Sequence, residues 1–193
     1  MIVKFDGFHG TDNDNVDSIL QDGFKISSGD KDWLGDGCYF FVEGINKNPC
    51  EQAVQWAILN AWDKINRKNK YVTYAVLHSN ITVDDSKFLD LTNADGVEIL
   101  DYIQKLCREK LATIGKRIHF IDGYLINFAR TEKIIDIEVT KGNVYIKLNI
   151  EDRIHNLSRR INNCTICSVY LPSNNIGKNI KLVKKGNVEY EIG

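Results

Sequence analysis

The chain has 193 residues, of which 43% are hydrophobic and 26% charged, with two prolines and a formal net charge of −1. This composition excludes a disordered chain and a uniformly basic nucleic-acid-binding protein, and the length fits one globular domain over residues 1–193. No apolar run approaches the roughly 20 residues that cross a bilayer, and no basic segment followed by an apolar one opens the chain. We therefore expect a cytoplasmic protein with no membrane partner.

The first third of the chain predicts alternating strands and helices. Residues 2–8 predict a short strand, and residues 14–22 predict a helix that ends before Gly23, a residue typical of helix ends. Residues 38–42 predict a second strand. Apolar side chains then recur at helical spacing over residues 49–66, the strongest helix signal in the sequence.

The middle and end of the chain predict helices and then strands. Residues 71–77 predict a strand, residues 97–114 an amphipathic helix, and residues 118–128 a shorter helical or mixed segment. Two strands, 134–139 and 144–150, flank a turn-like stretch at 141–143 and predict a hairpin. Further short strands are expected at 166–171, 180–183 and 188–192. This pattern favours an α+β fold with a largely antiparallel sheet.

The five cysteines are odd in number and irregularly spaced, which fits a reducing compartment better than a disulfide framework. Cys164 and Cys167 form one C-x-x-C pair. A zinc site needs a second pair or nearby histidines, so we expect strand residues there and no metal.

Three motifs in the first forty residues carry the functional information. They are Phe8-His9-Gly10-Thr11, then Gly23-Phe24-Lys25-Ile26, then Trp33-Leu34-Gly35-Asp36-Gly37-Cys38-Tyr39-Phe40. A glycine after a strand lets a ligand approach its backbone N–H and C=O, and a nicotinamide carboxamide needs both. Aromatic faces hold a flat cationic ring, which suggests Tyr39 as one wall and Trp56 as the other. Taken singly, each residue also fits a structural role as a turn, strand end or core side chain.

In order and spacing, these motifs resemble the PARP-like or diphtheria-toxin-like branch of the ADP-ribosyltransferases. The resemblance implies a split, mostly antiparallel sheet with helices around a cleft that takes NAD as co-substrate. It implies that His9 and Tyr39 are catalytic and that His9 binds ribose hydroxyls. It also implies that NAD is bound by His9, Gly10, Thr11, Asn15, Lys25, Tyr39 and Trp56.

The sequence departs from the family at the late strand. Much of the family has a glutamate there, whereas residues 164–170 contain no acid. One possibility is a non-acidic third catalytic residue, for which Thr165 or Cys167 is the candidate. A second is an acid from elsewhere, with Glu138 as the candidate. The third is a domain that binds NAD without turning it over.

The function implied is transfer of ADP-ribose from NAD to a macromolecular acceptor, which could be protein, DNA or RNA. Stand-alone relatives of this size are often toxins, effectors or phage-defence components, some with a cognate inhibitor or antitoxin. The net charge of +6 over residues 101–193, against −7 before them, would suit a nucleic-acid acceptor. A catalytically inactive NAD or ADP-ribose binding module and a structural domain without ligand are the alternatives.

Overall fold

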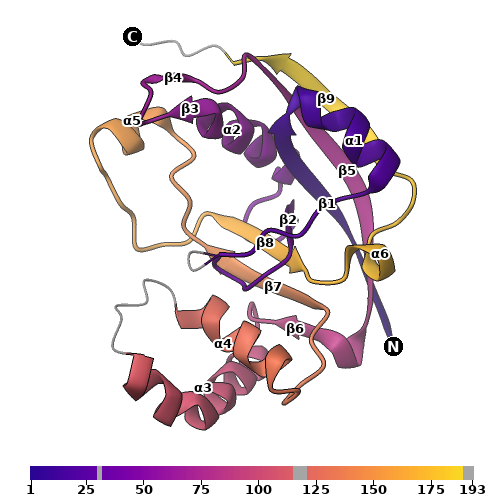
Figure 1. The fold of residues 1–193 in the computed structure, drawn as a ribbon, viewed down its shortest axis with the longest axis vertical. Helices are drawn as coiled ribbons and strands as arrows, with labels where there is room; N and C mark the ends of the chain where they lie inside the picture. The colour runs from indigo at the N-terminus through magenta and orange to yellow at the C-terminus, as the bar shows by residue number, and fades with distance from the viewer. Residues whose placement is uncertain (30–31, 115–120, 189–193) are drawn as a thin grey trace.

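A computed structural model describes residues 1–29, 32–114 and 121–188, which form a single α+β domain (Figure 1). The elements in chain order are β1 (Ile2–Asp12), η1 (Asn13–Asn15), α1 (Val16–Asp22), β2 (Cys38–Val42), α2 (Pro49–Ala61), β3 (Trp62–Asp63), β4 (Lys68–Asn69), β5 (Thr73–Asp84), η2 (Asp85–Lys87), β6 (Phe88–Asp90), α3 (Ala94–Ile114), α4 (Ile121–Thr131), β7 (Val139–Val144), α5 (Ile150–Ile154), β8 (Cys164–Val169), α6 (Pro172–Asn175) and β9 (Lys181–Asn187).

Seven of the strands in the described ranges form one mixed sheet, in the order β6-β7-β8-β2-β1-β5-β9. Neighbouring strands are antiparallel except β6 and β7, which are parallel. β3 and β4 form a separate antiparallel pair. The expectation of an α+β fold with a largely antiparallel sheet is therefore confirmed.

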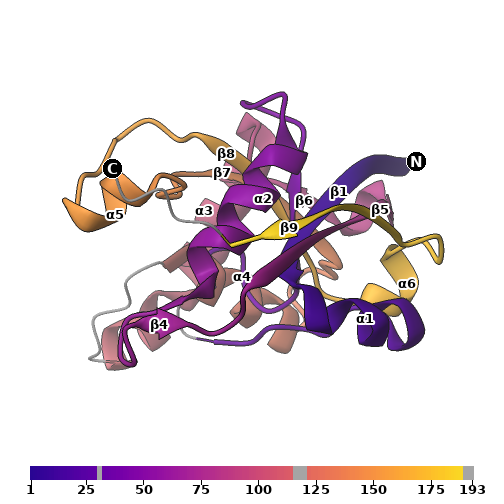
Figure 2. The same cartoon turned by 90° about the horizontal axis from the view of Figure 1, so that it is seen from above.

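The sheet has a hydrophobic core on each face because its strands alternate. In β2, Cys38, Phe40 and Val42 belong to one core, while Phe41 belongs to the other. The core that contains Phe41 is covered by α2, α3 and α4, and the opposite core is covered in part by α1. Figure 2 shows α1 and α6 on the other side of β5 and β9 from α2.

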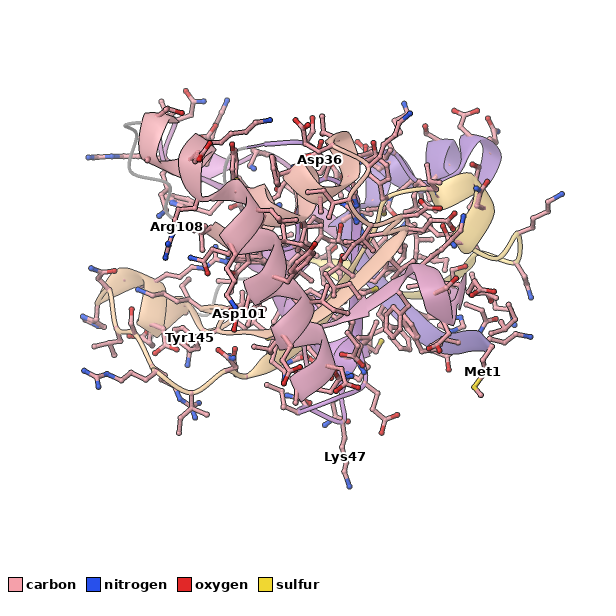
Figure 3. The ribbon with its side chains drawn as sticks, turned by 90° about the horizontal axis from the view of Figure 1, so that it is seen from below. Met1, Asp36, Lys47, Asp101, Arg108 and Tyr145 are labelled. Carbon is pink, nitrogen blue, oxygen red and sulfur yellow. The ribbon has the colours of Figure 1, made fainter. Side chains whose placement is uncertain are left out.

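The helices cover the sheet through apolar stripes of helical spacing. In α3, Ile103 and Cys107 are buried four residues apart, whereas Asp101 and Arg108 are exposed (Figure 3). The helix α2 begins at Pro49 and ends at Ala61, earlier than expected. The residues expected in its last turn instead belong to the β3–β4 hairpin. There the backbone of Trp62 is extended and pairs with that of Asn69.

The expected hairpin around residues 141–143 is wrong. Lys141, Gly142 and Asn143 lie inside β7, which pairs with β8 on one side and with β6 on the other. Gly142 allows the side chain of Leu34 to pack closely on β7, because a Cβ at this position would lie 3.0 Å from that side chain. Residues 134–138 and 145–149 are not strands, and residues 150–154 form the short helix α5.

The remaining expectations differ from the structure mainly at their ends. The strands expected at 2–8 and 71–77 extend as β1 and β5 to Asp12 and Asp84, because the two pair with each other over eleven positions. The helix expected at 118–128 corresponds to α4, and residues 118–120 lie outside the described residues. Most of the strand expected at 188–192 also lies outside them.

Candidate functional site

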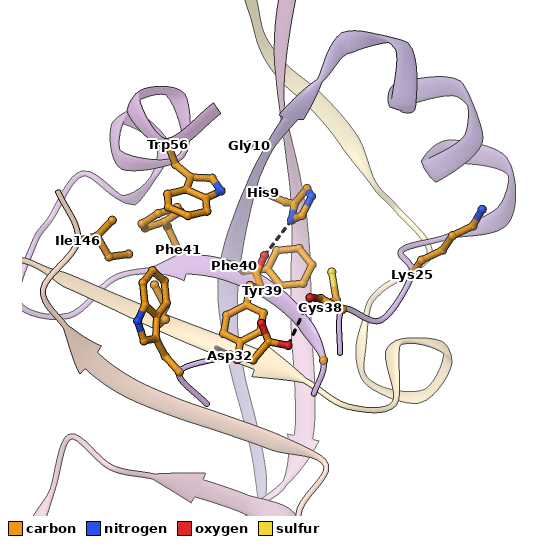
Figure 4. Close-up of a pocket in the computed structure, with 14 residues that line it drawn as sticks. His9, Gly10, Lys25, Asp32, Cys38, Tyr39, Phe40, Phe41, Trp56 and Ile146 are labelled. Carbon is orange, nitrogen blue, oxygen red and sulfur yellow. Dashed lines mark hydrogen bonds between the residues drawn. The ribbon is translucent and has the colours of Figure 1, made fainter. Parts of the chain in front are cut away.

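A cavity of about 320 Å³ lies where β1 and β2 part (Figure 4). The pairing of β1 with β2 covers two positions and ends at Phe8↔Phe41, whereas its pairing with β5 continues to Asp12↔Tyr74. From His9 onward, the edge of β1 that faces β2 therefore has no strand partner in the described ranges. The cavity is lined by His9, Gly10, Lys25, Ser27, Asp32, Trp33, Gly37, Cys38, Tyr39, Phe40, Phe41, Trp56, Ile146 and Ile166.

The side chain of His9 connects β1 to β2 at the point where the two strands separate. Its Nδ1 lies 2.8 Å from the backbone oxygen of Tyr39, and since a carbonyl only accepts, Nδ1 carries the proton. The ring also packs against Phe24 and Phe40, at centroid distances of 5.2 and 5.7 Å. Burial lowers the pKa of His9, outweighing the hydrogen bond to Tyr39, which raises it. The ring is thus held neutral, with Nε2 as a hydrogen-bond acceptor.

Tyr39 uses its hydroxyl to fix the loop that precedes β2. The hydroxyl donates to the carbonyl of Gly35 at 2.7 Å and accepts from the N–H of Leu34 at 2.9 Å. Burial raises the pKa of Tyr39, so the phenol stays protonated. Gly35 has a φ of +74°, a left-handed conformation that suits glycine. The hydroxyl is occupied by this loop, and the face of the Tyr39 ring is the part left to a ligand.

The same loop is anchored on α4, a connection that the sequence analysis missed. Asp36 and Asn127 exchange two hydrogen bonds of 2.8 Å each, and Arg130 donates to the carbonyl of Asp36 at 3.0 Å. Burial lowers the pKa of Arg130 to about 10. The available signal in the sequence was a pair of polar residues three positions apart, Asn127 and Arg130, among the apolar residues Leu125, Ile126, Phe128 and Ala129.

Two tryptophans form the wall on the α2 side. Trp56 projects from α2 and Trp33 from the loop before β2, with ring centroids 6.1 Å apart and ring planes at 61°. The guanidinium of Arg153, from α5, lies 5.9 Å from the Trp56 ring. Tyr39 and Trp56, the two walls suggested by the sequence, line the same cavity, and Trp33 is an additional wall that the sequence did not indicate.

Gly10 lines the cavity and also allows α2 to lie close to β1. A methyl group at this position would overlap the backbone carbonyl of Ala53 in α2. Packing alone therefore requires a glycine here, independently of any ligand.

The other predicted NAD-binding residues lie around the cavity. Lys25 is exposed at its rim, on the side that leads to α1 (Figure 4). Thr11 and Asn15 are not among the lining residues, and the Asn15 side-chain amide donates to the Thr11 hydroxyl at 3.0 Å.

None of the three candidates for the late-strand acid lines the cavity. Thr165 is buried, with its hydroxyl bonded to Asn143 at 2.7 Å and to the N–H of Ile45 at 3.0 Å. Cys167 is buried in the opposite core, and burial raises its pKa. The residue of β8 that lines the cavity is Ile166, between these two.

Glu138 is buried and bound to protein groups on both oxygens. It accepts from Lys87 at 2.6 Å and from the Asn175 amide at 2.9 Å. Residues 134–139 were expected to form a strand, whereas residues 134–138 lie outside any strand and Glu138 among them is buried.

Metal-binding clusters and membrane-spanning helices are both absent from the described residues. They contain no group of three or more His, Cys, Asp or Glu side chains arranged to hold a metal ion. No helix within the same ranges is long and apolar enough to cross a membrane. All five cysteines are free, and Cys164 and Cys167 lie in β8, as expected from the sequence.

Comparison with models of known protein families finds no match to the chain. Among curated proteins, an uncharacterized protein of Methanocaldococcus jannaschii, MJ0359, is 28% identical over 106 residues. The match covers 54% of this chain and 45% of that protein, so the chain spans less than half the length of this distant homologue. Function therefore has to be argued from the site.

Proposed function

We propose that the chain binds NAD in this cavity and transfers ADP-ribose from it to a macromolecular acceptor. The observation that carries the proposal is the 2.8 Å hydrogen bond between His9 and Tyr39, thirty positions apart, in a cavity that both residues line. These are the two residues to which the resemblance assigns catalysis. The parting of β1 and β2 at this bond also supports a split sheet of the ADP-ribosyltransferase kind.

The cavity walls fit the nicotinamide end of NAD. A carboxamide needs a donor and an acceptor, and Gly10 lies on the edge of β1 that has no partner in β2 within the described ranges. A flat cationic ring is well held by aromatic faces, and Tyr39, Trp33 and Trp56 supply them. These features support nicotinamide as the group bound in the cavity.

The remainder of NAD is assigned to the rim. Small-molecule sites measure about 300–1000 Å³, so a cavity of about 320 Å³ suits one end of a dinucleotide better than the whole of it. Lys25 at the rim would hold the diphosphate as a point charge. The side chains of Thr11 and Asn15 are hydrogen-bonded to each other. They would replace this bond with hydrogen bonds to the adenosine portion.

The residues of the cavity have distinct parts in the chemistry. Nε2 of His9 accepts a hydrogen bond from a ribose hydroxyl and fixes the sugar, and the backbone of Gly10 and the ring of Tyr39 hold the leaving nicotinamide. Cleavage of the bond between nicotinamide and ribose develops positive charge on the ribose. Rigid placement of both groups lowers the barrier because less motion has to be lost in the transition state.

The acceptor we propose is a protein, DNA or RNA, as for a toxin, an effector or a phage-defence component in the cytoplasm. A cognate inhibitor or antitoxin would be the matching partner. If the acceptor is a nucleic acid, activity should fall steeply with salt concentration.

The second candidate is an NAD or ADP-ribose binding module that acts through partners without turnover. Ile166 favours it, because the position of β8 that lines the cavity is apolar and supplies no charge to stabilise the ribose cation.

The deciding experiment measures two quantities on the purified chain, NAD binding by calorimetry and nicotinamide release from labelled NAD. The variants are His9→Ala and Tyr39→Ala, with His155→Ala as the matched control, because His155 is exposed and does not line the cavity. We expect His9→Ala and Tyr39→Ala to lose release and His155→Ala to keep it.

The outcomes separate the candidates. Release by the wild type that both cavity variants lose supports the enzyme. Binding without release, with or without cell lysate as a source of acceptor, supports the binding module. A wild-type chain that does not bind NAD contradicts both.

A further inference from the structure

Asp32 is the acidic residue that lines the cavity in the described part of the chain. It lies in the loop between α1 and β2, next to Trp33 and beside the ring of Tyr39 (Figure 4). Its carboxylate is half-buried, and its Oδ2 accepts a hydrogen bond from the hydroxyl of Ser27 at 3.4 Å. At least one of its oxygens therefore stays available to a ligand.

The backbone of Asp32 is held in place from two directions. Its N–H donates to the carbonyl of Gly29 at 3.2 Å. Its own carbonyl packs so closely on α4 that a methyl group at Gly123 would overlap it. Further along the loop, Asn127 and Arg130 of α4 bind Asp36. The position of Asp32 is thus fixed by the helix rather than left to a free loop.

Among the described residues, no cationic side chain forms a salt bridge with the carboxylate of Asp32. Burial is the main cause that raises its pKa, and the charge of Asp36 raises it further, while the hydrogen bonds from Ser27 and Gly29 act in the opposite direction. A half-buried carboxylate without a counter-ion is suited to a cationic ligand.

We propose that Asp32 is the catalytic carboxylate of this site and faces the positive charge of the nicotinamide ring and of the ribose as their bond breaks. This assignment rests on the proposed function. It explains how the cavity can contain a negative charge although Ile166, its lining residue on β8, is apolar. The acid comes from the loop before β2, which is anchored on α4, instead of from the late strand.

In the proposed step, one bond to C1′ of the ribose breaks and another forms. The bond between C1′ of the ribose and the nicotinamide nitrogen breaks, and its electron pair leaves with neutral nicotinamide. The carboxylate of Asp32 stabilises the cation left on the ribose. An oxygen or nitrogen of the acceptor, or of water in the basal reaction, forms the new bond to C1′. The proton of the acceptor passes to Asp32 and from there to solvent.

The test compares the full chain with Asp32→Asn, Asp32→Glu and Asp101→Asn. Asn keeps the size of the side chain and an acceptor for Ser27 but removes the charge. Asp101 is the matched control, since it is exposed on α3 and does not line the cavity (Figure 3). The measurements are the rate of nicotinamide release, with KM and kcat separated, and the affinities for NAD⁺ and for NADH, whose nicotinamide ring is uncharged.

We expect Asp32→Asn to lower kcat about 100-fold and to remove a roughly tenfold preference for NAD⁺ over NADH. Asp32→Glu should recover part of both, and Asp101→Asn should match the wild type. The NAD⁺ preference decides the assignment even if the chain binds without turnover. An Asp32→Asn variant with the wild-type preference and rate overturns the role of Asp32 alone, whereas a wild type that does not bind NAD overturns the proposed function.

Discussion

Asp36 and Asn127 lie 91 positions apart in the chain and exchange two hydrogen bonds, one from the backbone N–H of Asp36 and one from the amide of Asn127. The pair joins the loop before β2 to α4. Because Asp32, Trp33 and Gly37 of this loop line the cavity, the shape of the cavity depends on a helix that itself contributes no lining residue.

Replacing Asn127 by Ala should therefore weaken both the fold and the cavity. The partly buried N–H and carboxylate of Asp36 would lose their partners, at a cost of about 1–3 kcal/mol in the free energy of unfolding. Urea denaturation measures this cost, and NAD affinity should fall in the same variant. Asn179→Ala, at an exposed position, is the control. An unchanged denaturation midpoint in Asn127→Ala would show that the pair does not hold the loop.

Replacing Gly10 by Ala should destabilise the domain whether or not NAD binds. The added methyl overlaps the carbonyl of Ala53, so α2 has to move away from β1. Overpacking of this kind costs about 1–3 kcal/mol, which thermal unfolding would detect. Gly29→Ala is the matched control because the nearest atom to its added methyl is 3.9 Å away. Equal melting temperatures for the two variants would contradict the close packing of α2.

The buried ring of His9 predicts a pH dependence of stability. Its pKa is lowered in the folded state, mainly by burial. Below the ordinary histidine pKa of about 6.5, the unfolded chain therefore binds a proton more readily than the folded one, and stability falls as the pH falls. Denaturation at pH 7 and pH 5 should show a smaller loss for His9→Gln than for the wild type.

The control for this pH effect is His155→Gln, because His155 is exposed. It should follow the wild-type curve. Identical pH dependence in the wild type and His9→Gln would mean that another group carries the effect.

Glu138 should be required for stability but not for NAD binding. Its removal in Glu138→Ala leaves Lys87 and the amide of Asn175 without this partner, and we expect a loss of about 1–3 kcal/mol. Asp136→Ala, which removes the exposed acid 3.0 Å from the same lysine, should cost at most about 1 kcal/mol. NAD affinity measured on the folded variants should equal the wild-type value. A selective loss of affinity in Glu138→Ala would restore Glu138 as a candidate for the site.

The sequence predicted the α+β fold class because strand alternation and helical spacing are local patterns. His9, Gly10 and Tyr39 stand beside strand signals that the structure confirms, and their closeness follows from the pairing of adjacent strands. Trp56 lies in α2, the helix that the helical spacing predicted, and lines the same cavity as Tyr39.

The parts that the sequence did not predict depend on contacts between distant segments. The 141–143 stretch has turn-forming residues, yet pairing with β6 and β8 keeps it extended. The partnership of Asp36 with Asn127 and the lining role of Asp32 depend on where α4 packs, which no local pattern encodes. Alternation along β8 limited the late-strand candidates to one face, and the structure shows that Ile166 of the other face lines the cavity.

The position of β8 in the sheet has a consequence for the order of assembly during synthesis. β8 is inserted between β2 and β7, and β2 pairs with it over more positions than with β1. The wall that Ile166 provides leaves the ribosome long after His9 and Tyr39. Pairings between such distant segments form late and slowly in folding. A nascent chain that ends before β8 carries the motifs of the site without the wall that Ile166 provides, so any activity of the cavity begins only after β8 has been synthesised.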